Sequence, residues 1–133
     1  MTLVDTNVLI DILSMDQTWQ LWSTKALRQQ SQHGPLLINE IIYAELASRY
    51  ASQSALDAVV ENLDLDFEWL SKPALHIAGR VFSDYRRAGG VRTSILADFF
   101  IGAHASAAGI PILTRDTGRY HSYFPDVALI TPD

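Results

Sequence analysis

The sequence contains no cysteine, and this absence narrows the chemistry open to the protein. A chain without thiols has no disulfide framework, no thiolate metal site and no cysteine nucleophile, and it suits a reducing compartment. The sequence also lacks any apolar run near the ~20 residues that cross a bilayer. Met1 leads directly into an apolar strand pattern without a signal peptide. We therefore expect a cytoplasmic protein with no membrane partner.

Basic residues are fewer than acidic ones, 10 against 15, which gives a net charge of −5. This balance argues against a nucleic-acid partner, but a metal site built from carboxylates is itself acidic and its cations cancel part of the charge. Half of the basic residues lie between positions 86 and 119, namely Arg86, Arg87, Arg92, Arg115 and Arg119. We expect phosphate contacts from Arg92, Arg115 and Arg119, whereas Arg86 and Arg87 can equally be solvated surface charges.

Length and composition indicate one globular domain over residues 1–133, with 48% hydrophobic and 19% charged residues. Short apolar runs predict strands at residues 3–4, 36–38, 65–70, 110–113 and 127–130. Helices are predicted from about residue 7 to 13 and over 18–32, 39–50, 52–64, 71–88 and 94–108, with Thr18 and Ser71 among their caps. This alternation predicts an α/β fold, a three-layer α/β/α sandwich with a short, mostly parallel central sheet.

Two acidic residues follow predicted strands directly. Asp5 ends the first strand, and Asp116 stands at the end of the strand over 110–113. Because ligands bind at the carboxyl ends of strands in open parallel sheets, Asp5, Thr6 and Asn7 bring a carboxylate, a hydroxyl and an amide to that edge. Asp5 and Asp116 can each also serve only as a helix cap.

Four blocks of sequence carry a resemblance to a known family. They are Asp-Thr-Asn-Val-Leu-Ile-Asp at 5–11, Ile-Tyr-Ala-Glu-Leu at 42–46, Ala-Asp-Phe-Phe-Ile-Gly-Ala-His-Ala at 97–105, and Ile-Leu-Thr-Arg-Asp at 112–116 with Tyr-Phe-Pro at 123–125. In this order and at about this spacing, the blocks resemble the PIN domain, the nuclease domain of VapC-type toxins from bacterial toxin–antitoxin pairs. Each block is weak alone, but together they span nearly the whole chain.

The resemblance implies a catalytic set of four acids, Asp5, Glu45, Asp98 and Asp116. We expect Asp5, Asp98 and Asp116 to be metal ligands, and Glu45 to be a ligand of a second metal or a base that positions water. From its sequence neighbours alone, Glu45 can instead form an i,i+4 ion pair with Arg49. Thr6, Asn7 and Thr114 would orient the carboxylates or their waters.

Converging carboxylates need a cation, because one like-charge contact at ~4 Å costs about 4 kcal/mol at an effective dielectric of 20. Oxygen ligands favour Mg²⁺ or Mn²⁺ over Zn²⁺. Such an ion can polarise a phosphodiester and activate water. The four histidines show no ligand spacing and are expected to be structural or exposed: His33, His76, His104 and His121.

The resemblance also implies the substrate and the partners. The expected substrate is single-stranded or looped RNA, cut by hydrolysis, and the expected partners are a co-expressed antitoxin and a second copy of the chain. The inhibiting segment of the antitoxin should place an Arg or Lys near the acids. Trp19 and Trp22 are expected walls of its docking groove, unless both are buried within this chain.

The sequence departs from the family at three positions. Phe99 and Gly102 stand where relatives often carry Ala, Leu or Ile, and Arg119 stands near a position where some relatives carry a further acid. Two alternatives remain open. One is a metal-dependent phosphohydrolase of small substrates, although Asp5-Thr6-Asn7 lacks the second Asp of the HAD-type motif. The other is a catalytically silent interaction domain.

Overall fold

A five-stranded parallel sheet forms the centre of the protein in the computed structural model, which describes residues 1–132. The strands are β1 (Thr2–Val4), β2 (Leu36–Ile38), β3 (Leu65–Phe67), β4 (Ile112–Leu113) and β5 (Leu129–Ile130). Their order across the sheet is β3-β2-β1-β4-β5, and all four pairings are parallel. The first strand in sequence is therefore the middle strand, and Leu3 lies in register with Leu37 on one side and Ile112 on the other.

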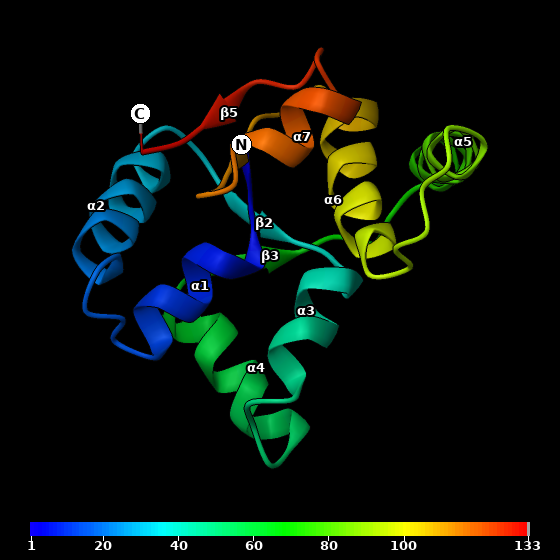
Figure 1. Cartoon of the computed structure of the whole chain (residues 1–133). Coiled ribbons are helices and arrows are strands. Elements are labelled where there is room, and N and C mark those ends of the chain that lie inside the picture. Colours follow the sequence, from blue (N-terminus) through cyan, green and yellow to red (C-terminus); the bar gives the residue numbers. More distant parts are fainter. Residues whose placement is uncertain (133) are drawn as a thin grey trace.

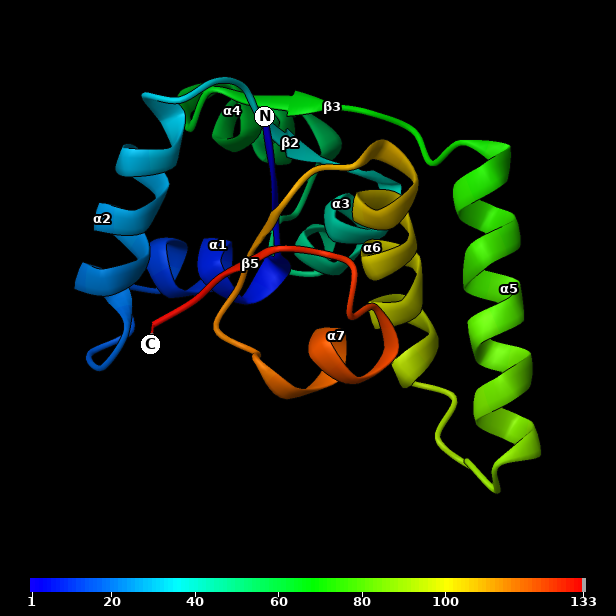
Figure 2. The same cartoon turned by 90° about the horizontal axis from the view of Figure 1, so that it is seen from above.

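Seven helices within residues 1–132 connect and cover these strands: α1 (Thr6–Leu13), α2 (Gln20–Ser31), α3 (Glu40–Ala47), α4 (Gln53–Asn62), α5 (Lys72–Arg87), α6 (Ile95–Ala108) and α7 (Gly118–Tyr123). Helix α1 packs against α2 and α3, α3 packs against α4 and α6, and α6 packs against α5 and α7. If the crossovers are right-handed, as is the rule between parallel strands, α1 to α4 cover one face of the sheet and α5 to α7 cover the other. In both views α2 and α5 lie at opposite ends of the molecule, with α6 between α5 and the rest (Figure 1 and Figure 2). The expected three-layer sandwich is confirmed.

The sheet is buried because helices cover it on both sides. Leu3 and Val4 of β1 and Ile112 and Leu113 of β4 have no exposed surface. Continuous apolar runs of this kind are typical of parallel strands that are buried on both faces. The ends of these strands are thus held firmly in place, and the polar residues that follow them are fixed with them.

Side-chain caps explain the starts of four of the seven helices within residues 1–132. Asp5, Asn39, Ser52 and Ser71 each accept hydrogen bonds from backbone N–H groups at the start of the following helix. Gly109 ends α6 in the left-handed conformation, with a φ of 66°. These starts and stops agree with the sequence prediction to within one or two residues.

The predicted cap at Thr18 is wrong. The N-terminal position of α2 is Trp19, which makes no side-chain capping bond. Oδ2 of Asp16 instead accepts hydrogen bonds from the backbone N–H groups of Thr18 and Trp19. An aspartate that binds the backbone N–H groups two and three residues later forms a turn of its own. This turn takes the place of a cap by the Thr18 hydroxyl.

Three strands are shorter than predicted, and one helix was not predicted. Ladder pairing covers only residues 65–67, 112–113 and 129–130 of the predicted ranges. Helix α7, over Gly118–Tyr123, escaped prediction because it has only six residues and no side-chain cap. No helix within residues 1–132 combines the length and apolarity that a bilayer crossing requires.

The unusual residues of the third sequence block have a packing role. Gly102 of α6 leaves room for the ring of Phe124, which a Cβ at this position would approach to 2.3 Å. Phe99, one turn earlier, lies 4.8 Å from the ring of Tyr123 and 6.3 Å from that of Phe124, centroid to centroid. These contacts fix the segment after α7 against α6, and so they fix α7 itself.

Candidate functional site

The four acids lie around the carboxyl ends of β1 and β4. The strand order reverses between these two strands, and such a switch point is where open α/β sheets bind ligands. Asp5 follows β1, Thr114 and Asp116 follow β4, and Glu45 and Asp98 project from α3 and α6. The site residues thus come from four separate segments of the chain.

Asp5 is the buried centre of this site, with 6% of its surface exposed. Its Oδ1 accepts a hydrogen bond from the backbone N–H of Thr6 at 2.7 Å. Its Oδ2 accepts from Thr114 Oγ1 at 2.8 Å, from Tyr120 OH at 3.1 Å and from Asn7 Nδ2 at 3.3 Å. Asp5 is therefore both a helix cap and a carboxylate held in one orientation, so the two interpretations of this residue are compatible.

Burial raises the pKa of Asp5 to about 6, and its hydrogen bonds with Thr114, Tyr120 and Thr6 only partly oppose this effect. The negative charge of Asp98 raises the pKa further. Burial and the charge of Asp5 likewise raise the pKa of the Tyr120 hydroxyl well above its usual value. A buried acid in such a setting favours either a proton or a nearby cation.

Thr6 connects Asp5 to the second acid. Its backbone N–H binds Asp5, and its hydroxyl donates a hydrogen bond to Oε1 of Glu45 at 2.6 Å. Glu45 is otherwise exposed to solvent, and it makes no ion pair with Arg49 within the described residues. The carboxylate of Glu45 is thus turned toward Thr6.

Arg119 of α7 joins the remaining two acids. Its Nη1 contacts Oδ2 of Asp98, and its Nε lies 3.1 Å from Oδ2 of Asp116. The backbone N–H of Arg119 also donates to Oδ1 of Asp116 at 3.2 Å. The pKa of Arg119 is raised above its usual value, chiefly by its hydrogen bond with Asp98.

The donor chemistry of the site fits a hard divalent ion, although the conformation described here brings together only two carboxylates around one cation. Within residues 1–132, no three carboxylate or imidazole groups stand close enough to share one metal ion. Asp98 and Asp116 converge on a single positive group, the guanidinium of Arg119, and Asp98 is near enough to raise the pKa of Asp5. Carboxylate oxygens of this kind suit Mg²⁺ or Mn²⁺. Asp5, Asp98 and Asp116 are the carboxylates that could hold such an ion.

The other two predicted phosphate-binding arginines lie in different settings. Arg115 makes two bonds with buried Asp11, from Nε at 2.6 Å and from Nη2 at 2.9 Å. Its guanidinium also lies 5.1 Å from the ring centroid of Trp19. Arg92 is exposed in the loop between α5 and α6, where its backbone N–H donates to the hydroxyl of Tyr85. Arg115 therefore has a structural partner, whereas the side chain of Arg92 faces solvent.

Three side chains that support the site were not predicted. Tyr120 is buried and binds Asp5. Asp11, also buried, holds Arg115 and accepts a hydrogen bond from Ser23 Oγ at 2.7 Å. The sequence offers one hint for Asp11, which stands four residues after Asn7 and so on the same face of α1. Asn39 caps α3, the helix of Glu45, and its amide contacts Nδ1 of buried His104 at 3.0 Å.

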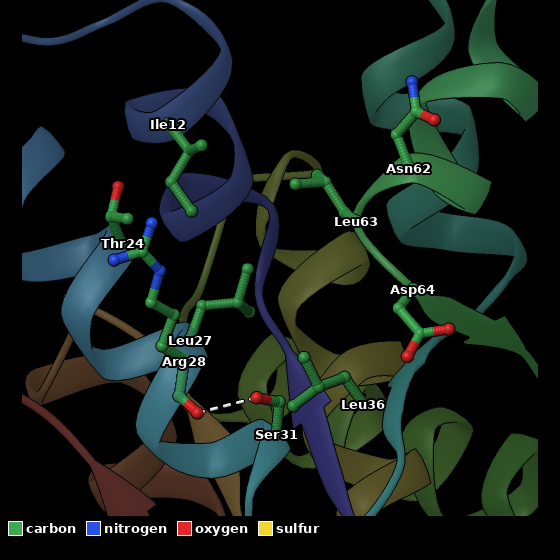
Figure 3. A pocket seen from close by; sticks show the side chains of 9 residues that line it. All are labelled: Ile12, Thr24, Leu27, Arg28, Ser31, Leu36, Asn62, Leu63 and Asp64. Atoms are coloured by element: carbon green, nitrogen blue, oxygen red, sulfur yellow. Dashed lines mark hydrogen bonds between the residues drawn. The ribbon is translucent and has the colours of Figure 1, made fainter.

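A hollow of about 430 Å³ lies away from the acids, between α1, α2 and the turn after α4 (Figure 3). Its apolar lining consists of Ile12, Leu27, Leu36 and Leu63. The two tryptophans are not among its lining residues. Trp19 and Trp22 are half-buried, form an edge-to-face pair with centroids 6.3 Å apart, and contact Arg115 through Trp19.

Comparisons with known proteins agree with this fold. The family model described as PIN domain matches residues 2–125. VapBC2 from Rickettsia felis, bound to a promoter DNA fragment, has a TM-score of 0.74 at 16% identity, covering 99% of this chain and 98% of that chain. VapBC-1 from nontypeable Haemophilus influenzae has a TM-score of 0.73 at 16% identity, and the match covers 98% of this chain and 96% of that chain. FitAcB from Neisseria gonorrhoeae has a TM-score of 0.64 at 23% identity, and the match covers 99% of this chain and 98% of that chain. The comparison with curated proteins gave no match.

Proposed function

Because this chain belongs to the PIN domain family, we propose that it is a metal-dependent endoribonuclease and the toxin of a toxin–antitoxin pair. The observation that carries the proposal is the gathering of Asp5, Glu45, Asp98 and Asp116 at the switch point of the sheet. Similar solved structures, among them a complex described as a toxin–antitoxin complex from Klebsiella pneumoniae, add support.

The proposed catalytic roles follow from the contacts of each acid. Asp5, Asp98 and Asp116 would hold Mg²⁺ or Mn²⁺, which supplies charge stabilisation at the phosphodiester and an activated water. Asp5 can do this only as a carboxylate, and Thr114, Tyr120 and Asn7 hold it in place by donating to its Oδ2. Thr114 also accepts a hydrogen bond from the backbone N–H of Asp116, so one hydroxyl aligns two of the proposed ligands.

Glu45 is the proposed base. Its Oε1 accepts a hydrogen bond from the hydroxyl of Thr6, and its exposed position lets its other oxygen receive a proton from water. Thr6 contacts both Asp5 and Glu45, which fixes the distance between the metal side and the base side of the site. Binding to a second metal ion is the other role open to Glu45.

The RNA would approach along the basic residues near this edge. Arg92 is exposed and can contact a phosphate without losing an ion pair within the described residues. Arg119 can do so only after it leaves Asp98 and Asp116, and Arg115 would contact RNA while it stays bound to Asp11. Contacts of this kind confer salt-dependent binding with little sequence preference.

The proposed partners are a cognate antitoxin and a second copy of the chain. The antitoxin would insert an Arg or Lys near the carboxylates, whose charges attract a basic side chain. Trp19, beside Arg115, stays our proposed wall of its docking groove because aromatic side chains are common in interface cores. The proposal retains the cytoplasmic location expected from the sequence.

The decisive experiment is RNA cleavage by purified protein with and without Mg²⁺ or Mn²⁺, using wild type, Asp98→Asn and Asp66→Asn. Asp66 is an exposed acid of β3 and serves as the control of equal charge change. We expect Asp98→Asn to lose at least about 100-fold in activity and Asp66→Asn to retain it. Equal activity of Asp98→Asn and wild type would refute the assignment. Metal-dependent hydrolysis of p-nitrophenyl phosphate without RNA cleavage would favour the small-substrate enzyme, and no hydrolysis at all would favour the silent domain.

A further inference from the structure

The contacts of Arg119 indicate more than a surface ion pair. One guanidinium bridges two carboxylates from different elements, Asp98 on α6 and Asp116 after β4. Both acids are proposed metal ligands, so Arg119 occupies the place where their ligand oxygens converge. The side chains of Asp98 and Asp116 are 19% and 28% exposed, and that of Arg119 is 42% exposed.

We propose that Arg119 is a built-in counterion: it holds Asp98 and Asp116 together in the metal-free site and must be displaced when the metal ion enters. This inference rests on the proposed metal-dependent function. Arg119 is then a positioning residue that competes with the metal, and it opposes metal binding even though it keeps the ligands in place.

Electrostatics supports this competition. Without Arg119, Asp98 and Asp116 would face one another with like charges, which is costly when the groups are only partly solvated. Arg119 neutralises this repulsion, at the cost of the conformational entropy that its flexible side chain loses. A divalent ion carries twice the charge of the Arg119 guanidinium. Before the ion can bind Asp98 and Asp116, however, the contacts of Arg119 with both carboxylates must break.

The anchoring of Arg119 makes displacement of the guanidinium feasible without unfolding. Its backbone is held at the start of α7, where its N–H donates to Asp116 Oδ1, and the next residue, Tyr120, is buried against Asp5. The guanidinium itself is exposed enough to rotate into solvent. Movement is thus confined to the side chain, and its new position lies at the rim of the site, where an RNA phosphate would pass.

The direction in which metal affinity changes when Arg119 is removed distinguishes this role from a purely structural one. If Arg119 only preserved the shape of the site, its loss would weaken metal binding. If it competes with the metal, its loss strengthens binding, because the metal no longer displaces a cation. Removal of one positive charge beside a divalent ion should tighten binding about tenfold.

The test is titration of the metal-free full-length protein with MnCl₂ by calorimetry, without RNA, for wild type, Arg119→Gln, Arg119→Lys and Arg80→Gln. Arg80 is an exposed arginine of α5 and controls for the change in net charge. We expect about tenfold tighter binding for Arg119→Gln, wild-type affinity for Arg80→Gln, and an intermediate affinity for Arg119→Lys, which keeps the charge but not the two-pronged contact.

A second measurement covers the case in which Arg119→Gln is less stable. The melting temperature of Arg119→Gln should be lower than that of wild type without metal, and it should rise more on addition of Mn²⁺. Equal or weaker Mn²⁺ binding by Arg119→Gln, with wild type binding Mn²⁺ normally, would overturn the counterion role and leave the nuclease proposal standing. A failure of both wild type and Arg119→Gln to bind Mn²⁺ would overturn both.

Discussion

The hydroxyl of Tyr120 donates a hydrogen bond to Oδ2 of Asp5 at 3.1 Å, between residues that are 115 positions apart in sequence. Both side chains are buried, Tyr120 with 1% and Asp5 with 6% of its surface exposed. The contact therefore ties the end of the central strand to the short helix α7 in a largely buried place. It makes Tyr120 part of the site, although it is not one of the four acids.

Replacement of Tyr120 by Phe removes this donor while preserving the ring. Because the hydrogen bond with Tyr120 lowers the pKa of Asp5, its loss should raise that pKa above about 6 and move the pH midpoint of Mn²⁺ binding upward. The loss of one buried hydrogen bond should also cost about 1 kcal/mol of stability. Urea denaturation and Mn²⁺ titration between pH 5 and 8 measure both effects. An unchanged pH midpoint would show that Tyr120 does not influence Asp5.

The raised pKa of Asp5 makes stability depend on pH in a defined direction. The native state holds a proton on Asp5 up to a pKa of about 6, whereas in the unfolded chain the group ionises near 3.8. Between these values the native state binds more protons, so the metal-free protein gains stability as the pH falls. From pH 7.5 to 5 the free energy of unfolding should rise by about 1.4 kcal/mol through Asp5, because pH 5 lies one unit below the native pKa. Urea denaturation in EDTA should show this difference between wild type and Asp5→Asn, which lacks the titrating group.

Metal ions should stabilise the native protein, because only the folded chain gathers the acids. At a concentration 100 times the dissociation constant, the stabilisation is about 2.7 kcal/mol. Asp116→Asn should lose most of the resulting rise in melting temperature while remaining folded, and Asp66→Asn should keep it. Differential scanning calorimetry with and without MgCl₂ measures this rise. A rise of the same size in all three proteins would locate the stabilising ion elsewhere.

Replacement of only one partner of the Asp11–Arg115 ion pair should lower the stability of the protein strongly. Asp11 is 2% exposed, so Arg115→Met leaves a buried carboxylate with only Ser23 as a donor and should cost about 3 kcal/mol. The double variant Asp11→Leu/Arg115→Met removes both charges and should be more stable than Arg115→Met alone. Chemical denaturation of wild type, Asp11→Leu, Arg115→Met and the double variant tests this non-additivity. If the double variant were as unstable as the sum of the single ones, the pair would not be coupled.

The part of the site that follows strands was predictable from the sequence, because an apolar run that stops at a polar residue marks both a strand end and a sheet edge. Asp5, Thr6 and Asn7 were assigned to the sheet edge in this way, whereas Thr114 was assigned a role through the family resemblance. Tyr120 was not found, since α7 is too short for its periodicity to be visible. No local pattern links Asp11 to Arg115, which is 104 residues away.

Strand lengths were overestimated for a related reason. The apolar run over 110–113 includes Pro111, which has no N–H to donate, and pairing begins only at Ile112. The contacts of Arg119 were also beyond prediction, because its charge suggested a phosphate partner outside the chain. Opposite charges can be paired only when the fold is known, and here the fold brings α6 and α7 together.

The middle position of β1 has a consequence for biosynthesis. This strand leaves the ribosome before the other four, and its neighbour β4 and the donors Thr114 and Tyr120 are made more than a hundred residues later. A nascent chain that has reached only residue 110 holds Asp5 and Asp98, but it lacks Asp116 and the two donors Thr114 and Tyr120 that bind Oδ2 of Asp5. Because domains form their long-range contacts only when both segments exist, the acids come together late. The protein being made therefore carries no complete site while most of its length is still being translated.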